Sequence, residues 1–374
     1  MGRVRTHRMT RIRQAFFELL RSGLWGTTPA SVCFPLSPDE WQQLHGEACR
    51  QTVQGIVYDA LRLLPEHLVP PTALTFQWTS DVTHIITAYE RTQHVVAATY
   101  NLLCQAGTEP VLLKGLASAH CYPKPQLRVN GDIDWYLPPT AFSSISAFLE
   151  QQGIHARQHA DGSLCFYYDS IEVELHPRLA DILWPSHQKA LSDIVACEGY
   201  DTLPVGNTGQ PSINVPMAGP TATLLIHASH IFKHTASVGI GLRQFCDLAL
   251  ACYHLREHYD EDLLTGAFQQ TGLLRWSRLL ELFLCRNLGL DTPLHHTDAL
   301  ASEADCDRLL HLTLNGGNFG QHTIQWQQAH ANGRNRLHTL RSYCQHAPFA
   351  LRYAPKEALC LLFSLAKGQQ NIQI

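Results

Sequence analysis

The spacing of hydrophobic residues changes twice along this 374-residue chain, and the change limits the folds that it can adopt. From Thr10 to about Gly107, apolar residues recur at helical intervals. The middle of the chain contains runs that alternate as strands do, separated by helical segments. Helical spacing then returns. The pattern predicts an α+β protein with a helical N-terminal region (1–107), a sheet-containing core (108–215) and a helical C-terminal domain (216–374).

Individual elements can be placed within this outline. Helices are expected where the helical period is clear: Asp81–Gln105, Thr140–Gln152, Thr221–His234, Arg243–His254, Asp262–Gly272 and Leu274–Leu288. Strands are expected where apolar residues alternate or form a short run: Pro110–Gly115, Val129–Leu137, Ser163–Tyr168 and Ile171–Leu175. Asp169 and Ser170 separate the last two, which predicts a hairpin. No strand is predicted in Pro204–Pro220, a stretch that contains glycine and proline.

Composition excludes several classes of protein. Because 28 Lys and Arg residues stand against 32 Asp and Glu residues, the net charge of −4 gives no general field that attracts a nucleic-acid backbone, although a local basic groove is compatible with it. The 12 cysteines form no C-x-x-C pair, which indicates reduced thiols. Charged residues interrupt the longest apolar stretch, Leu273–Leu290, and no signal-peptide core is visible. A cytoplasmic protein without a membrane partner is predicted.

The most informative motif is Gly131–Leu137, in which two acids stand two positions apart on a predicted strand. Because side chains alternate between the faces of a strand, Asp132 and Asp134 share one face. Two carboxylates held so close repel each other unless a cation lies between them. Magnesium prefers oxygen ligands and leaves positions for substrate phosphates. The pair is therefore a candidate magnesium site, although alone it would fit two solvated acids on an edge strand equally well.

A second group of polar residues follows on the predicted strand after Ser170. Glu172, Glu174 and His176 share one face there. If this strand pairs near Val129–Leu137, a third acid reaches the same metal ions. Two-metal phosphoryl transfer requires such an arrangement, because one ion activates the incoming oxygen and the other stabilises the leaving one.

A candidate phosphate-binding turn lies upstream of these acids. Leu112–Ser118 ends a predicted strand at a glycine and begins a predicted helix. Gly115 would allow a phosphate close to the backbone, the helix N-terminus offers free N–H groups, and Lys114 adds a compact positive charge. The chain has no Walker-type loop and no G-x-G-x-x-G motif.

Two arginines are further candidates for ionic contacts. Arg128 lies four residues before Asp132, where its guanidinium would hold a pair of triphosphate oxygens or form a structural salt bridge to the acidic strand. Arg243 and Asp247 stand four positions apart on a predicted helix, which favours an ion pair between them.

The helix after residue 220 carries several basic side chains. His227, His230 and His234 share one face and raise the question of a zinc site. Because no other Cys or His lies nearby at ligand spacing, we expect them to line the cleft or to pack in the core. Lys233 is a candidate phosphate contact or an ordinary exposed lysine.

These residues together carry a resemblance to a known family. The residues in question are Leu113-Lys114-Gly115, Tyr122-Pro123, Arg128, Asp132-Ile133-Asp134 and Glu174-Leu175-His176, followed by His230, Lys233, His234, Arg243 and Asp247. The series resembles the uncharacterised bacterial nucleotidyltransferase family of the DNA polymerase beta superfamily, over about residues 111–250. The resemblance implies a polymerase-beta-like core, a small mixed β-sheet with flanking helices, in which Asp132, Asp134 and Glu174 bind Mg²⁺ or Mn²⁺.

The resemblance also implies a function. A metal-dependent nucleotidyltransferase would move a nucleoside monophosphate from a nucleoside triphosphate, such as ATP, to an acceptor hydroxyl or phosphate. The phosphates would be held by Lys114, Gly115, Arg128 and Lys233. A protein, an RNA or a small molecule is the acceptor in different members of the superfamily, and neither it nor the oligomeric state follows from the sequence.

Two alternatives stay open. One is a catalytically inactive nucleotide-binding or scaffold protein of the same fold, favoured by Lys114-Gly115 standing in place of the glycine-serine signature of the wider superfamily. The other is a toxin-type RNA nucleotidyltransferase, because relatives with this layout include toxins that transfer nucleotides to RNA.

Overall fold

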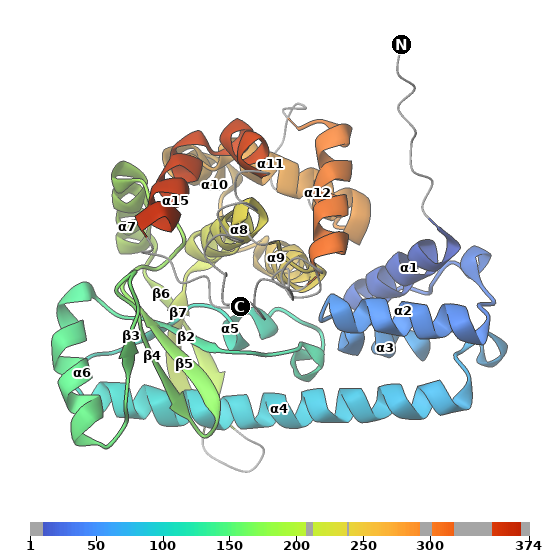
Figure 1. Ribbon diagram of the computed structural model, residues 1–374, viewed down its shortest axis with the longest axis horizontal. Helices are drawn as coiled ribbons and strands as arrows, with labels where there is room; N and C mark the ends of the chain where they lie inside the picture. Colours follow the sequence, from blue (N-terminus) through green and yellow to red (C-terminus); the bar gives the residue numbers. More distant parts are fainter. Residues whose placement is uncertain (1–9, 207–211, 238, 292–300, 318–345, 368–374) are drawn as a thin grey trace.

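A seven-stranded mixed sheet lies among helices drawn from both ends of the chain (Figure 1). The computed structural model describes residues 10–206, 212–237, 239–291, 301–317 and 346–367. It shows the N-terminal helices at one end, the C-terminal helices above the sheet, and one long helix running below both (Figure 1). The mixed α/β content agrees with the predicted α+β class.

Three N-terminal helices form the group at the right of Figure 1: α1 (Arg11–Trp25), α2 (Pro38–Arg50) and α3 (Gln54–Leu61). Helix α2 begins with a capping box. The hydroxyl of Ser37 accepts a hydrogen bond from the backbone N–H of Glu40, whose carboxylate accepts one from the backbone N–H of Ser37. Such reciprocal bonds satisfy N–H groups that a helix start leaves unpaired.

Helix α4 (Thr72–Gln105) connects the N-terminal helices to the sheet. It has 34 residues, which corresponds to about 51 Å at the usual rise of an α-helix. Its first half packs on α3, and its second half lies below the sheet (Figure 1). The helix predicted at Asp81–Gln105 is confirmed and begins earlier, directly after Pro71.

The sheet has the strand order β3-β4-β5-β2-β1-β7-β6. The strands are β1 (Val111–Leu112), β2 (Ile133–Tyr136), β3 (Arg157–Gln158), β4 (Leu164–Tyr168), β5 (Ile171–His176), β6 (Tyr200–Val205) and β7 (Ile213–Ala218). Strand β2 pairs parallel with β5 and antiparallel with β1, and β1 pairs parallel with β7. The hairpin predicted between β4 and β5 is confirmed, and Asp169 and Ser170 both have positive φ, as a tight two-residue turn requires.

The β6–β7 hairpin overturns one expectation from the sequence. No strand was predicted in Pro204–Pro220, yet β6 ends and β7 lies within it. Proline lowers the strand propensity of this stretch. Pro204 lies on the edge strand β6, where a missing N–H is tolerated, whereas Pro216 lies in β7, between β6 and β1. As a result the sheet extends to Ala218, beyond residue 215.

The other helices flank the sheet or build the C-terminal group. They are α5 (Leu116–Ala119), α6 (Phe142–Gln151), α7 (Pro185–Glu198), α8 (Pro220–Ser237), α9 (Leu242–Leu255), α10 (Glu261–Gln270), α11 (Leu274–Phe283), α12 (Glu303–Gly316) and α15 (Pro355–Lys367). A π-helical segment, Leu284–Leu288, extends α11. The helices predicted from period between residues 221 and 288 are confirmed, whereas α7 was not predicted.

The buried hydrophobic residues form two cores. The first joins the N-terminal helices to the C-terminal helices, so the two ends of the chain fold together. The second lies between the sheet and helices α4 and α6. Ile133 and Trp135 of β2 and Val173 and Leu175 of β5 belong to this second core. Because strand side chains alternate, the residues between them point to the opposite face of the sheet.

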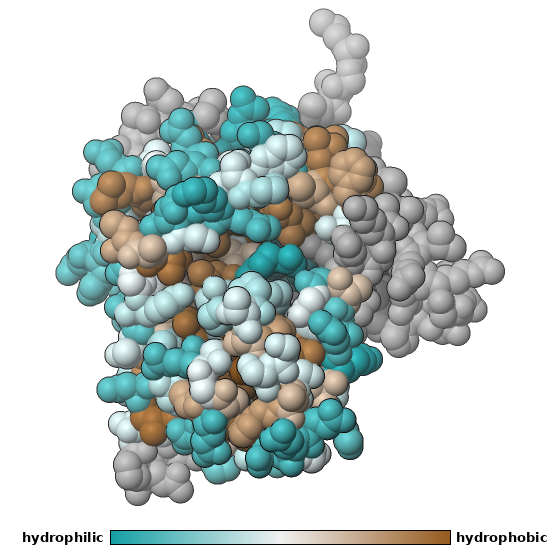
Figure 2. Space-filling view, turned by 90° about the vertical axis from the view of Figure 1, so that its left-hand side faces the viewer, coloured by the Kyte–Doolittle hydropathy of each residue, from teal (hydrophilic) through white to brown (hydrophobic). Residues whose placement is uncertain are grey.

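On the face shown in Figure 2, hydrophobic side chains lie in separate patches among hydrophilic ones. Every cysteine described is a free thiol, as predicted. Within the described residues, no helix is both long enough and apolar enough to cross a membrane.

Gly55 of α3 lies where a side chain has no room. A Cβ there would overlap the backbone carbonyl of Leu127, directly before Arg128. We expect Gly55→Ala to lower the free energy of unfolding by about 1–3 kcal/mol, measured by urea denaturation. Gly46→Ala in α2 is the matched control, because a Cβ there meets no atom within 4 Å and alanine favours a helix. Equal losses of stability in the two variants would contradict the close packing at Gly55.

Candidate active site

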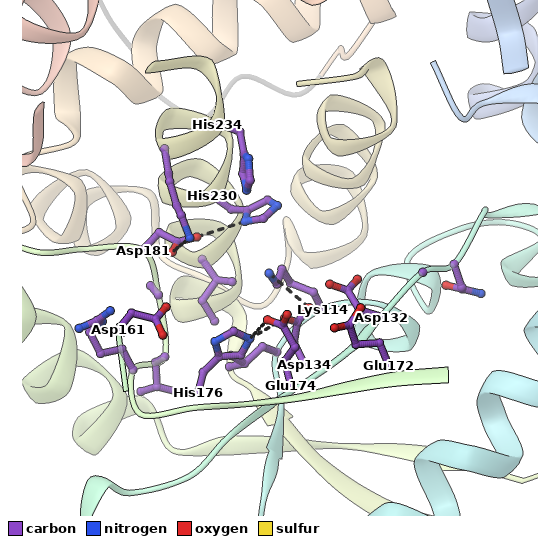
Figure 3. A pocket seen from close by; sticks show the side chains of 18 of the residues that line it. Lys114, Asp132, Asp134, Asp161, Glu172, Glu174, His176, Asp181, His230 and His234 are labelled. Carbon is purple, nitrogen blue, oxygen red and sulfur yellow. Dashed lines mark hydrogen bonds and ion pairs between the residues drawn. The ribbon is translucent and has the colours of Figure 1, made fainter. Parts of the chain in front are cut away.

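A cavity of about 500 Å³ lies on the face of the sheet opposite the second core, bordered by α8 and α9. Six acids line it: Asp132, Asp134, Asp161, Glu172, Glu174 and Asp181. The carboxylates from the region of β2 and β5 gather on one side, and His230 and His234 extend from α8 on the other (Figure 3). All three acids predicted as metal ligands therefore reach one cavity.

The strand register explains how these acids meet. Parallel pairing of β2 with β5 places Asp134 directly opposite Glu174. Asp132 stands just before β2 and lines the same cavity. The expectation that the two acidic strands are neighbours is confirmed.

Asp134 is the most tightly held of the acids. His176 Nε2 lies 2.7 Å from its Oδ1, and Lys114 Nζ lies 3.3 Å from its Oδ2. Burial opposes the ionised form, but the charge of Lys114 and the hydrogen bond from His176 outweigh it and hold the pKa of Asp134 well below its usual range. This carboxylate is therefore ionised at neutral pH.

The pKa values of the two neighbouring acids are raised, opposite to the shift at Asp134. The charge of Asp134, followed by burial, raises the pKa of Asp132. Burial, followed by the charge of Asp134, raises the pKa of Glu174 to about 7. Lys114 and His176 thus do not neutralise the whole cluster, and a divalent cation would relieve the remaining repulsion.

The donor atoms are suited to a metal ion. Ligand atoms of Asp134, Glu174 and His176 lie within 4.8 Å of one another. Asp132 is not part of this close group but supplies a further carboxylate to the cavity. Carboxylate oxygens are the ligands that magnesium prefers. The residues present fit a hard divalent cation.

The predicted phosphate-binding turn forms a single short helical turn, α5, after Gly115. Gly115 has φ 63°, in the left-handed region that favours glycine, and it lines a smaller pocket of about 50 Å³ that shares lining residues with the main cavity. Lys114 lines both pockets and is paired with Asp134. The two residues thus border the acids from the side of β1.

Arg128 forms a buried salt bridge with Asp247. Its Nε and Nη2 donate to the two carboxylate oxygens of Asp247 at 2.7 and 2.8 Å, and Tyr122 donates to the same carboxylate at 2.6 Å. Arg128 Nη1 donates to Asn130 Oδ1. The structure thus shows the salt bridge that was one of two roles predicted for Arg128, but the partner lies on α9 and not on the acidic strand.

The contacts of Arg243 differ from the ion pair predicted for it. The expected ion pair with Asp247 is wrong: Arg128 and Tyr122 bind that carboxylate instead. Arg243 Nη1 instead donates to the carbonyl of Val129 at 2.8 Å. Its side chain is buried, lines both pockets, and leaves Nε without a hydrogen-bond partner among the described residues. A buried N–H of this kind is costly unless a ligand accepts from it.

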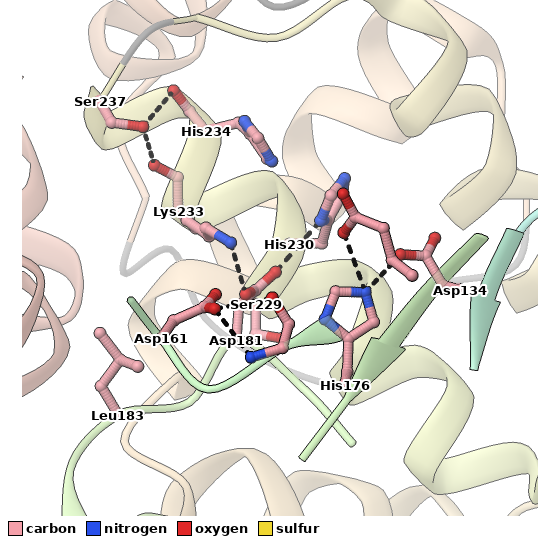
Figure 4. A network of polar contacts seen from close by, with 12 residues as sticks. Asp134, Asp161, His176, Asp181, Leu183, Ser229, His230, Lys233, His234 and Ser237 are labelled. Atoms are coloured by element: carbon pink, nitrogen blue, oxygen red, sulfur yellow. Dashed lines mark hydrogen bonds and ion pairs between the residues drawn. The ribbon is translucent and has the colours of Figure 1, made fainter. Parts of the chain in front are cut away.

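A second polar network lies across the cavity from β2 (Figure 4). Asp181 binds Lys233 Nζ at 2.8 Å and His230 Nδ1 at 3.1 Å. His230 and His234 line the main cavity and His227 the smaller pocket, as expected for a cleft. Burial lowers the pKa of His227 and of His230 to about 4, which keeps both neutral.

Asp181 and the contact of His176 with Asp134 were not predicted from the sequence. Asp181 follows β5 in a segment without helical or strand period, so no pattern marked it. His176 was placed on the face of Glu174, and that position was the available signal for its contact with Asp134. Arg243 was named in the family resemblance and as half of an ion pair, but not as a phosphate contact.

Comparison with known proteins identifies the family of this chain. Residues 37–289 match the uncharacterised nucleotidyltransferase family. The chain belongs to this family. The match runs from the N-terminal helices through the sheet to the end of the segment after α11, and so includes the whole cavity. No curated protein and no solved structure matches this nucleotidyltransferase family member.

Glu174 gives this family member a measurable pH dependence. Its pKa of about 7 in the folded chain lies above the usual 4.5, so the folded chain retains a proton that the unfolded chain releases between these values. With a chelator present, we expect Glu174 to contribute a fall in the free energy of unfolding as the pH rises from about 5 to about 8, measured by urea denaturation as the difference between the native chain and Glu174→Gln.

The Glu174→Gln variant should lose part of this slope, because its side chain does not titrate. Glu150→Gln, on the exposed face of α6, is the matched control and should keep the full slope. An unchanged slope in Glu174→Gln would show that the pKa of Glu174 is not raised.

Proposed function

We propose that this chain is a metal-dependent nucleotidyltransferase that acts in the cytoplasm. It transfers a nucleoside monophosphate from a nucleoside triphosphate to an acceptor hydroxyl or phosphate. The observation that carries the proposal is the parallel register of β2 and β5, which sets Asp134 opposite Glu174 in a cavity shared with Asp132 and Lys114. Membership of a nucleotidyltransferase family and the mixed sheet support a polymerase-beta-like core.

Asp132, Asp134 and Glu174 would hold Mg²⁺ or Mn²⁺ in this proposal. When bound, such ions activate an incoming oxygen and neutralise charge that develops on the phosphates. The carboxylate oxygens of the cavity match this requirement, and the raised pKa values of Asp132 and Glu174 mark the repulsion that a cation would relieve.

The triphosphate would be held by positive groups that border the acids. Lys114 supplies a compact charge next to Asp134, and Gly115 allows a phosphate close to the backbone. We add Arg243 to this set because its buried Nε lacks a partner within the described residues. Lys233 is a more remote contact, since Asp181 already binds it.

Arg128 serves the site through its salt bridge and not through a phosphate contact. Its bidentate salt bridge with Asp247 joins the segment before β2 to α9. We assign it the role of a positioning residue that holds Asp132 in place relative to Arg243.

The transfer itself is a substitution at phosphorus. The acceptor oxygen forms a bond to the α-phosphorus, the bond from the α-phosphorus to the bridging oxygen breaks, and pyrophosphate leaves. Where the acceptor is a hydroxyl, its proton is released to solvent as the new bond to phosphorus forms. Charge stabilisation and positioning would supply most of the rate.

The acids are expected to be essential for transfer. Incubation of the chain with labelled nucleoside triphosphates, Mg²⁺ and a cell extract should label an acceptor, whose identity separates a protein, an RNA and a small molecule. Asp132→Asn with Asp134→Asn should reduce labelling by at least about 100-fold, because the charge that holds the cations is removed. Asp193→Asn, on the exposed face of α7, is the control and should keep full activity.

Retained labelling in the double variant would contradict the mechanism. Binding of the nucleotide by the native chain without any transfer would instead support the inactive scaffold, the alternative that Lys114-Gly115 favours. Labelling of RNA, together with growth arrest that Asp132→Asn relieves, would support the toxin.

Arg243 and Arg128 should respond differently to substitution. Arg243→Gln should raise the KM for the nucleoside triphosphate at least about tenfold, because a charged hydrogen bond to a phosphate is lost. Arg128→Gln should mainly lower the free energy of unfolding, by about 3–5 kcal/mol, since it leaves Asp247 buried without its partner. Steady-state kinetics and urea denaturation on both variants check this, and exchanged effects would reverse the two assignments.

A further inference from the structure

We propose that this chain has a second metal site, for zinc, formed by His45, Cys49 and Asp81 between α2 and α4. One potential ligand atom from each residue lies within 4.8 Å of the others. None of the three lines the acidic cavity, so the site is separate from the proposed active site. The proposal therefore does not rest on the proposed function.

The two distances from His45 Nε2 to the other donor atoms are close to those around zinc. His45 Nε2 lies 3.5 Å from Cys49 Sγ and 2.9 Å from Asp81 Oδ2. With Zn–N and Zn–O bonds of about 2.0–2.1 Å and a Zn–S bond of about 2.3 Å, tetrahedral geometry separates N and S by about 3.6 Å and N and O by about 3.3 Å. The N···S distance already fits, and the N···O distance would lengthen by about 0.4 Å.

Hydrogen bonds alone leave one unfavourable contact among His45, Cys49 and Asp81, whichever tautomer His45 adopts. If His45 Nε2 carries a proton, it donates to Asp81, and the Cys49 thiol faces an N–H. If Nε2 carries a lone pair, it accepts from the thiol, but the lone pair then faces the Asp81 carboxylate at 2.9 Å. A cation between an imidazole, a thiolate and a carboxylate interacts favourably with all three.

The site is preorganised by its helices. His45 and Cys49 stand four positions apart, so they are neighbours on one face of α2. The imidazole of His45 is buried and contacts the ring of Trp78 edge-on, with 4.8 Å between the ring centroids. Trp78 is itself fixed, because its indole N–H donates to the carbonyl of Gln54. A ring held in this way loses little freedom when a metal binds.

The donor set selects zinc over the magnesium proposed for the active site. Thiolate and imidazole are ligands for zinc and similar transition metals, whereas magnesium takes oxygen ligands. The Asp81 side chain is 35% exposed, which gives an ion a path from solvent and leaves a fourth position for water. Bound zinc would link α2 to α4, the helix that continues below the sheet.

A cobalt titration tests this proposal, because tetrahedral Co²⁺ bound to a thiolate has visible d–d bands and a near-ultraviolet charge-transfer band. The full chain with Asp132→Asn and Asp134→Asn is used, so that uptake by the acidic cavity is suppressed. We expect about one equivalent of Co²⁺ to produce both bands, Zn²⁺ to displace it, and Zn²⁺ to raise the Tm.

Two substitutions and one control locate the ion. Cys49→Ser should abolish the charge-transfer band, and His45→Asn should weaken uptake at least about tenfold. Cys197→Ser, which removes an exposed thiol of α7, should leave both bands unchanged. Absence of the thiolate band in the chain with Cys49 intact, or its persistence in Cys49→Ser, would overturn the proposal. The first of these outcomes is decisive even if a variant does not fold.

Discussion

The carboxylates of Asp134 and Glu174 stand side by side on adjacent parallel strands, and their repulsion must be balanced by positive charge. Lys114 and His176 provide part of this balance and keep Asp134 ionised. They do not provide all of it, because the pKa values of Glu174 and Asp132 are raised. Unbalanced negative charge in a cavity of this size is costly for an isolated chain and useful for one that binds cations with a triphosphate.

The surrounding fold keeps these charges in place. The underside of the sheet is fixed by the second core, which includes α4, and the upper side is closed by α8 and α9 of the first core. The buried salt bridge between Arg128 and Asp247 crosses from the segment before β2 to α9. Such a pair adds little net stability but is demanding in geometry, so it fixes the position of the backbone that leads to Asp132.

The sequence predicted what depends on local period and missed what depends on tertiary contacts. Asp132 and Asp134 could be assigned to one face of their strand, and Glu174 and His176 to one face of theirs, because alternation along a strand is a local property. The parallel pairing that sets Asp134 opposite Glu174 was only a condition of the prediction, since it joins distant parts of the chain. The β6–β7 hairpin was missed because Pro204 and Pro216 lower the strand propensity of this stretch, whereas its strands form by pairing with each other and with β1. The partners of Arg128 and Arg243 were missed because they lie more than a hundred residues away in the chain.

The account depends most directly on divalent cations at the acids of β2 and β5. A crystal structure of the chain with Mn²⁺ and a non-hydrolysable nucleoside triphosphate analogue, with anomalous scattering to locate manganese, tests this claim. We predict manganese bound by Asp132, Asp134 and Glu174, with the phosphates next to Lys114 and Arg243. A nucleotide bound without manganese at these acids, or manganese only elsewhere on the chain, would contradict it.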